Sequence, residues 1–472
     1  MAIYKKYFSE NRDRTFPIYA YSPPPQGKYW IDDVIYPTDD FRTVERYKEY
    51  KECGFNVLFM QRTAAYNGEE WDTCETKRAM QNAVEAGIEK IIIVDERIFD
   101  LSTESSSLIG ENKRFASESE LDDFIRDCIK DYKNEKGFYG VQLMDEPFHP
   151  RLDAVGEVFH SLRRVDDSIF VHCNLNPLSL PTMAFRICPD GKNLRERYAN
   201  YLEMFLEKTG TNYIMVDTYP YVKNGGDTYI GRYYFACLEI IARVCKKRNV
   251  EMHMVMQSFA MTVRNKYHHL MPTKQVMEYQ KNVLRGYGVK EFSYFTYWTK
   301  QANKTDGEMF VDGKAMMTRH GEKTKTYYHV QKINKEINEL APLLCDFEYQ
   351  TNAFFALPPL FSRPTFLDTV DGGELSQISK VTIDKEVLLV CEQFDKKHEQ
   401  YMYCATNISD PKRYRRQYGN EKQTTEMAFN DKYNVADVYF KGKWKTVKLQ
   451  DGKLKFELYS GEGIIILPYK EA

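Results

Sequence analysis

The chain has 472 residues, of which 66 are basic and 68 are acidic, so its formal net charge is only −2. This balance excludes the strong positive charge with which proteins attract nucleic acids or anionic membranes. No apolar run reaches the length of about 18 residues that a membrane-spanning helix needs. The length exceeds that of one ordinary domain and suits two or three.

The ten cysteines are scattered and lack the paired spacing of metal sites. They predict reduced, mostly buried thiols in a cytoplasmic protein. No apolar signal region follows Met1, although a secretion signal removed before this point would leave the same beginning. We expect neither a metal nor a cofactor, and no pattern in the sequence indicates an oligomeric state.

Eight apolar segments are predicted to form parallel strands that are buried on both faces, because most are continuous apolar runs rather than alternating ones. They are Pro17–Tyr21, Asn56–Gln61, Lys90–Glu96, Phe138–Met144, Ile169–Asn174, Tyr213–Asp217, Met252–Gln257 and Phe292–Trp298.

Amphipathic segments between these strands are predicted to be helices. Gly54 and Gly87 follow two of them as C-terminal stops, and residues 117–120 have the pattern of a capping box. The predicted helices are Phe41–Cys53, Thr73–Ala86, a third helix that begins at Ser117, Leu152–Arg164, Leu194–Lys208, Ile230–Lys247, Lys274–Arg285 and Lys323–Leu340.

This alternation predicts an α/β fold. The first strand is followed by Ser22 and three prolines rather than by a glycine-rich phosphate loop. Eight complete units therefore favour a closed (β/α)8 TIM barrel over an open doubly wound sheet. We assign residues 1–344 to a barrel catalytic domain.

The pattern changes after Pro342. Turn pairs such as Lys441-Gly442 and Asp451-Gly452 separate short strand-like segments, which predicts a C-terminal antiparallel β-sandwich domain over residues 345–472. The segments are Val387–Cys391, Tyr401–Ala405, Val435–Tyr439, Trp444–Lys448, Lys453–Leu458 and Gly463–Leu467.

The active site of a β/α barrel lies at the C-terminal ends of its strands. Glu251 and Glu291 open their strands, so they are predicted to lie at the opposite end. The predicted strand ends supply acids, amides and aromatic rings, a composition typical of carbohydrate sites. The candidates are Tyr21, Asp95, Glu96, Asp145, Glu146, Asn174, Asp217, Tyr219, Gln257 and Trp298.

The segment Tyr139-Gly140-Val141-Gln142-Leu143-Met144-Asp145-Glu146-Pro147 resembles strand four of clan A glycoside hydrolases. In that clan an Asn-Glu pair, often followed by Pro, ends this strand, and the Glu is the general acid/base. The resemblance implies that role for Glu146. It also implies that Trp298 is the Trp that lies beneath the sugar at the end of strand eight. Residues 324–337 resemble the final barrel helix of the β-galactosidase-like members, which also have C-terminal β-domains.

The sequence departs from this pattern at two positions. Asp145 replaces the Asn, and Gln257 stands where the clan has its nucleophilic Glu at the end of strand seven. An amide cannot attack an anomeric carbon, so the second acid must lie elsewhere. Asp217 is our first choice, by analogy with α-galactosidase-type barrels. There the strand-four acid is the nucleophile and the strand-six acid donates the proton, so the roles of Glu146 and Asp217 stay open. The next candidates for the second acid are Asp95, Glu96, Asp306 and Glu308.

We therefore predict a glycoside hydrolase that cleaves an oligo- or polysaccharide with Glu146 and Asp217. The predicted substrate-binding residues are Tyr21, Asp95, Asn174, Tyr219, Gln257 and Trp298. One alternative is a non-catalytic carbohydrate-binding barrel, which Gln257 supports. Another is a metal-dependent barrel enzyme, which the lack of clustered histidines at the strand ends disfavours.

Three geometric expectations follow. Clan A members often have a cis peptide bond after the strand-eight Trp, so the resemblance implies a cis Trp298–Thr299 bond. If Glu146 is the proton donor, burial and a neighbouring charge should raise its pKa, whereas Asp217 should stay ionised. The amide at position 257 favours inversion, for which the two carboxyl groups should lie about 6.5–9.5 Å apart.

Overall fold

The structure is a computed structural model. It describes residues 2–26, 28–31, 34–37, 40–62, 70–178, 190–224, 227–263, 267–299, 315–357 and 365–471.

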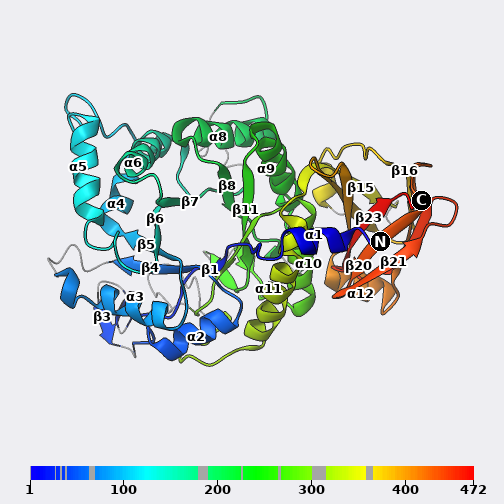
Figure 1. Cartoon of the computed structure of the whole chain (residues 1–472), viewed down its shortest axis with the longest axis horizontal. Helices are drawn as coiled ribbons and strands as arrows, with labels where there is room; N and C mark the ends of the chain where they lie inside the picture. The colour runs from blue at the N-terminus through cyan, green and yellow to red at the C-terminus, as the bar shows by residue number, and fades with distance from the viewer. Residues whose placement is uncertain are drawn as a thin grey trace.

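Eight parallel strands form a closed barrel (Figure 1). They belong to two four-stranded sheets, and backbone hydrogen bonds close both seams between the sheets. Leu175 N donates to Met215 O (2.9 Å) at one seam, and Asn56 N donates to Ile18 O (2.9 Å) at the other. The strands are β1 (Ile18–Ala20), β4 (Leu58–Arg62), β5 (Ile91–Asp95), β6 (Phe138–Asp145), β7 (Phe170–Asn174), β8 (Tyr213–Asp217), β11 (Glu251–Gln257) and β14 (Glu291–Phe295).

Helices surround the barrel, and local signals define their ends. Ser117 Oγ accepts from Glu120 N and the Glu120 carboxylate accepts from Ala116 N, as in a capping box. Gly54 and Gly87 have positive φ, which suits a helix C-terminus. The helices are α2 (Val44–Glu52), α3 (Glu75–Glu85), α4 (Glu96–Leu101), α5 (Glu118–Ile129), α6 (Leu152–Val165), α8 (Leu194–Thr209), α9 (Tyr234–Arg248), α10 (Lys274–Gly286) and α11 (Lys325–Leu344), with short 3-10 helices η2 (Trp71–Thr73) and η3 (His149–Arg151).

The barrel has two separate apolar layers. The larger one lies between strands and helices, and a smaller one fills the barrel interior. The interior is polar at the end where the strands begin: Tyr19 Oη donates to the Glu291 carboxylate, and His253 Nε2 lies 3.0 Å from Glu251 Oε2. Glu251 and Glu291 thus lie at the base, as predicted. The interior core residues are Tyr19, Val57, Phe59, Ile92, Tyr213, Met215 and Val255.

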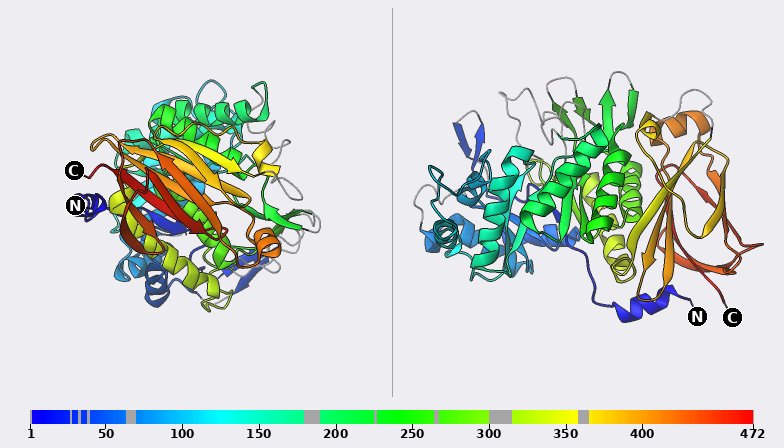
Figure 2. Two further views of the ribbon diagram at one scale, coloured as in Figure 1. Left: turned by 90° about the vertical axis from the view of Figure 1, so that its right-hand side faces the viewer. Right: turned by 90° about the horizontal axis from the view of Figure 1, so that it is seen from above.

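Short strands that the sequence analysis did not predict extend the loops at the opposite end, where the barrel strands finish (Figure 2). One pair follows β1, and a four-stranded antiparallel sheet is built from the loops after β8 and β11. The predicted helix start at Ile230 was therefore too early, because Ile230 ends a strand and α9 begins at Tyr234. These strands are β2 (Lys28–Ile31), β3 (Val34–Pro37), β9 (Tyr221–Asn224), β10 (Asp227–Ile230), β12 (Met261–Val263) and β13 (Tyr267–His269).

The C-terminal region is antiparallel, as predicted. Its strands form a six-stranded sheet, β15-β17-β18-β23-β20-β21, and a three-stranded sheet, β16-β19-β22, which enclose their own apolar core. The elements are β15 (Glu348–Ala356), η4 (Thr365–Asp368), β16 (Ile378–Ile383), β17 (Val387–Asp395), β18 (Gln400–Asn407), α12 (Pro411–Tyr418), β19 (Gln423–Phe429), β20 (Val435–Phe440), β21 (Lys443–Lys448), β22 (Lys453–Leu458) and β23 (Gly463–Tyr469).

The N-terminal helix α1 (Tyr4–Glu10) packs on this C-terminal region and on the barrel helix α11 (Figure 2). The Tyr4 ring stacks on Trp444 with centroids 4.4 Å apart, and Tyr7 Oη donates to Asp395 Oδ2 (2.7 Å). The division into residues 1–344 and 345–472 stays a prediction.

Two further properties concern the whole described chain. None of its helices is long and apolar enough to cross a bilayer. The nine cysteines in the described ranges are free thiols, and eight of them are buried.

Candidate active site

The candidate site lies where three neighbouring barrel strands end. Asp145 is the last residue of β6, Asn174 the last of β7 and Asp217 the last of β8. Asp145 and Asn174 are paired in the parallel register, and Glu146 follows directly. Strands four and six of the barrel therefore bring Glu146 and Asp217 together on either side of Asn174.

The chain leaves β6 in an unusual conformation. A register shift between Gln142 and Met144 precedes the end of the strand, and bulges of this kind commonly redirect side chains beside active sites. Glu146 itself has φ +49°, a left-handed conformation that costs a non-glycine residue about 1–2 kcal/mol. Its N–H still donates to the Asn174 carbonyl (2.8 Å). Such strain is concentrated at functional sites, where the surrounding structure enforces it.

The peptide after Glu146 is held by two buried side chains. The Pro147 carbonyl accepts from Tyr201 Oη (2.6 Å) and from Asn176 Nδ2 (2.9 Å). This support fixes the backbone on which the Glu146 carboxyl is mounted. Sequence reasoning did not find Tyr201 or Asn176, because neither belongs to a motif.

A hydrogen-bond network links the polar groups. Asn174 Nδ2 donates to Asp145 Oδ1 (3.0 Å) and to Asp217 Oδ1 (3.2 Å). Asp217 also accepts from Tyr219 and shares a hydrogen bond with the Glu146 carboxyl. The two carboxyl groups are thus in direct contact, which leaves no room between them for the water that the expected spacing of roughly 6.5–9.5 Å would admit.

Burial and neighbouring negative charges raise the pKa values of both acids. The pKa of Glu146 rises to about 7, through burial first and the Asp145 charge second. Burial and the charges of Glu146 and Asp145 hold the pKa of Asp217 well above its usual range. Asp217 is only 8% exposed, whereas Glu146 is half-buried. Burial therefore disfavours the ionised form of Asp217, whose carboxyl is the more deeply buried of the two.

Aromatic rings form one wall beside the acids. Tyr21, Tyr219 and Phe295 are half-buried, and the Phe295 ring lies 6.2 Å from each tyrosine ring, measured between centroids. Phe259 supports Phe295 edge-on at 4.8 Å. The Tyr21 hydroxyl is buried and has no hydrogen-bond partner in the ranges that the structure describes. The sequence analysis selected Tyr21 and Tyr219 but missed Phe295, the last residue of the eighth strand.

Trp298 does not occupy the position expected of it. The eighth strand ends at Phe295, and the Trp298 side chain is 3% exposed and packs against Phe41 with centroids 4.6 Å apart. Burial in the core leaves no ring face for a sugar. The predicted cis bond is also misplaced: the cis peptide joins Phe295 and Thr296, not Trp298 and Thr299.

Asp95 is another correction, because it is structural rather than substrate-binding. Its fully buried carboxylate caps α4 by accepting from Arg97 N, forms a two-point ion pair with the Arg97 guanidinium and accepts from Tyr132 Oη. Its neighbour Glu96 is half-buried, and burial raises its pKa.

Gln257 is also fully buried and is not placed to touch a sugar. Its Oε1 accepts from Tyr221 N, and its Nε2 donates to the carbonyls of Tyr221 and Leu270. The amide therefore binds β9 and the end of the β12–β13 hairpin to the barrel. Of the remaining second-acid candidates, Asp306 and Glu308 lie outside the described residues.

Potential metal ligands gather elsewhere. In the parts of the chain that the structure describes, the group close enough to hold an ion is Asp346, Asp395 and His398, beside α1. Asp395 already accepts from Tyr7, His398 and the Lys397 N–H. These contacts explain the cluster as a hydrogen-bond network that links α1 to β17.

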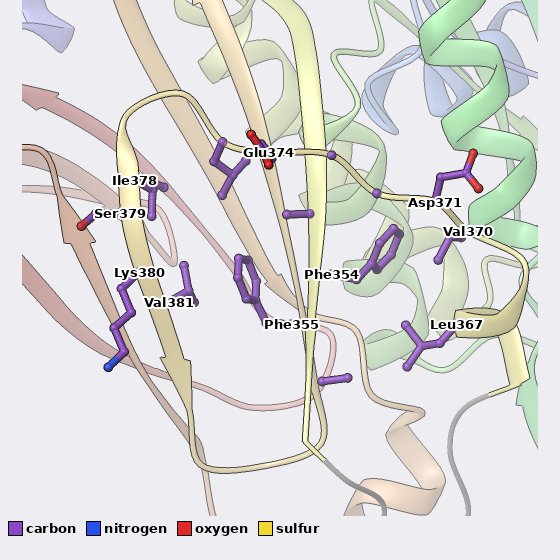
Figure 3. A pocket seen from close by; sticks show the side chains of 15 residues that line it. Phe354, Phe355, Leu367, Val370, Asp371, Glu374, Ile378, Ser379, Lys380 and Val381 are labelled. Carbon is purple, nitrogen blue, oxygen red and sulfur yellow. The ribbon is translucent and has the colours of Figure 1, made fainter.

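A cavity of about 570 Å³ also lies away from the acids, between β15 and β16 (Figure 3). Its wall is both apolar and polar, with Phe354, Phe355 and Lys380 among its residues, and its Asp371 is paired with Arg195 and Arg243. It contains none of the predicted site residues.

Comparison with known proteins gives a likeness in structure but not in sequence. No family model matches the chain, and no curated protein matches it. A solved structure described as a glycoside hydrolase superposes with a TM-score of 0.55 at 10% identity, covering 96% of this chain and 92% of that one. AmyP in complex with maltose superposes with a TM-score of 0.51 at 9% identity, covering 99% of both chains. At such low identity these likenesses concern the fold alone: the chain has a TIM-barrel fold followed by a C-terminal antiparallel sheet region.

Proposed function

We propose that this protein is a glycoside hydrolase that cleaves a glycosidic bond in an oligo- or polysaccharide. The observation behind the proposal is the Glu146–Asp217 carboxyl pair, which lies at the C-terminal ends of strands four and six of a glycosidase-like barrel. Most glycoside hydrolases use two carboxyl groups to catalyse this reaction. Raised pKa values keep one proton available in the pair near neutral pH.

Glu146 and Asp217 differ in burial, and this difference determines which of them we assign as the proton donor. Asp217 is the more buried acid, and burial favours its protonated form, so we assign it as the proton donor. It protonates the glycosidic oxygen while the bond from that oxygen to the anomeric carbon breaks, the bonding electrons remaining on the oxygen. Glu146, more exposed and ionised above about pH 7, then attacks the anomeric carbon or takes a proton from an attacking water.

The carboxyl contact must open for this chemistry. A sugar ring enters only if the two groups move apart to the spacing of one of the two mechanisms. Glu146 is the half-buried partner and is the one we expect to move. The rings of Tyr21, Tyr219 and Phe295 offer faces for the apolar side of the sugar. The exposed Asp145 is placed to accept hydrogen bonds from the hydroxyl groups of the sugar.

A non-catalytic carbohydrate-binding barrel is the second candidate. The observation that favours it is Gln257, which stands at the end of strand seven and uses its amide on backbone groups. In such a binding protein the two carboxyl groups stay in contact and bind sugar hydroxyl groups without cleaving a bond.

One experiment separates the two candidates. The protein is incubated with a panel of aryl α- and β-glycosides and of natural oligosaccharides, and released phenol or new reducing ends are measured. Hydrolysis that Glu146→Gln and Asp217→Asn both abolish supports the enzyme. Binding of an oligosaccharide without hydrolysis supports the binding protein instead. For any substrate that is cleaved, the anomer of the first product, seen by proton NMR, decides between attack by Glu146 and attack by water.

A further inference from the structure

Asn174 lies at the centre of the acid cluster rather than at its rim. Its Nδ2 reaches Asp145 on one side and Asp217 on the other, at 3.0 and 3.2 Å. Its backbone carbonyl accepts from Glu146 N. Asn174 therefore contacts all three acids: its side-chain amide contacts Asp145 and Asp217, and its backbone carbonyl contacts Glu146.

This position does not suit the sugar-binding role expected from the sequence. The two amide hydrogens point to two carboxyl groups, and the side chain is only 3% exposed. No side-chain N–H remains for a sugar hydroxyl, and the Oδ1 atom is buried.

The charge that develops during the proposed reaction lies next to this amide. Asp217 becomes an anion when it gives up its proton, and two donors already touch it, Asn174 Nδ2 and the Tyr219 hydroxyl. Donors that are fixed beforehand where charge develops stabilise a transition state without reorganising at the moment of reaction.

We propose that Asn174 is a positioning residue: its amide holds the Asp217 carboxyl against Glu146 and stabilises the negative charge that Asp217 acquires on giving up its proton. The catalytic role of Asn174 rests on the proposed function. The way in which Asp217 and Glu146 share a proton, however, can be measured in the free protein without any substrate. Without the amide, Asp217 is a weaker acid and is less ready to protonate a leaving group.

Asn282 provides a matched control. It is a second buried asparagine, 4% exposed, and its Nδ2 donates to the Gly461 carbonyl (2.9 Å) rather than to a carboxylate. Asn174→Ala and Asn282→Ala each remove one buried amide and leave a similar cavity. Only the first removes a donor from the acid pair.

The test is an infrared titration of protonated carboxyl groups in the free, full-length protein. The infrared signal of the acid pair is the part of the wild-type carboxyl signal that is lost in Asp217→Asn and in Glu146→Gln. In Asn174→Ala we expect the pKa of Asp217 to rise by about one unit, a tenfold change in its ionisation constant. Asn282→Ala should leave the titration as in wild type. Should Asn174→Ala fail to fold, Asn174→Leu keeps a similar volume, lacks the donor, adds no titrating group, and should shift the titration in the same direction.

Kinetics give a second readout once a substrate is found. Asn174→Ala should lower kcat about tenfold or more with little change in KM, and should move the alkaline limb of the pH profile upward. An unchanged titration in both Asn174 variants overturns the inference. So does a raised KM with an unchanged pH profile, because that is the behaviour of a hydroxyl-binding residue. A shifted titration in a protein that cleaves no glycoside supports the role of Asn174 and contradicts the proposed function alone.

Discussion

Glu146 and Asp217 are joined by a side-chain hydrogen bond across the ends of β6 and β8. Two ionised carboxylates can only accept hydrogen bonds, so the contact requires a proton on one of them. The pair therefore loses its protons in two steps, and each step is a property of the pair rather than of one residue. Asp145 adds a third charge, which raises the pKa of each.

The first prediction concerns the acids themselves. Glu146→Gln and Asp217→Asn should each lower turnover by at least about 10²-fold, because each removes a group that transfers a proton or attacks the sugar. Substrate binding should be largely retained, and the measurement is steady-state kinetics on a substrate found in the panel. Asp153→Asn, which changes a half-exposed acid on α6, is the control and should behave as wild type. Near-normal turnover in Asp217→Asn would place the second acid elsewhere, with Glu96 next in order.

The second prediction concerns stability and pH. The pKa of Glu146 is raised from 4.5 to about 7 by folding, so between these values the folded state binds more protons than the unfolded state. The free energy of unfolding must then fall as pH rises through this window, and Asp217, whose pKa is also raised by folding, adds to the fall. Denaturant midpoints at about pH 5 and about pH 8 measure it.

Glu146→Gln tests the origin of that fall. The variant removes the titrating group and relieves the repulsion on Asp217, so its stability should depend less on pH and exceed that of wild type at about pH 8. An equal pH dependence in wild type and variant would contradict the assignment. Asp153→Asn, which leaves the pair intact, should keep the wild-type dependence.

The third prediction separates two aromatic residues. Trp298→Ala should destabilise the protein by about 3–5 kcal/mol, because it empties a fully packed core position. Phe295→Leu should unfold at nearly the wild-type midpoint but weaken sugar binding by up to about tenfold, since it removes a ring face beside the acids. Thermal unfolding and ligand titration compare the two variants. If Trp298 were the sugar platform, the effects on binding would be reversed.

The fourth prediction concerns Gln257. Gln257→Glu creates the acid that clan A enzymes have at this position, but it removes the Nε2 donor from the carbonyls of Tyr221 and Leu270. We expect a loss of stability of about 1–3 kcal/mol for each carbonyl left without a partner, and no gain in turnover. Unfolding by urea and the same kinetic assay check both parts. A clear gain in turnover would show that this position faces the substrate after all.

The order of elements in the barrel could be predicted from the sequence, because parallel strands buried on both faces and amphipathic helices produce local patterns. Glu146, Asp217 and Tyr219 could also be selected, since each follows or ends a recognisable strand and the barrel requires such residues to meet at one end. The short strands that extend the rim could not, because they depend on pairing between loops that are distant in the chain.

Which polar strand-end residues reach the opening was decided by tertiary structure. Side chains alternate along a strand, so Asp95, next to the inward-facing Val94, turns to Arg97 and Tyr132 in the helix layer. Gln257 faces the barrel end, but the backbones of Tyr221 and Leu270 cover it. The register shift in β6 and the left-handed Glu146 then set where the catalytic candidate lies. A sequence determines which side chains a strand end offers, whereas contacts between distant segments determine which of them stay free of backbone and core partners.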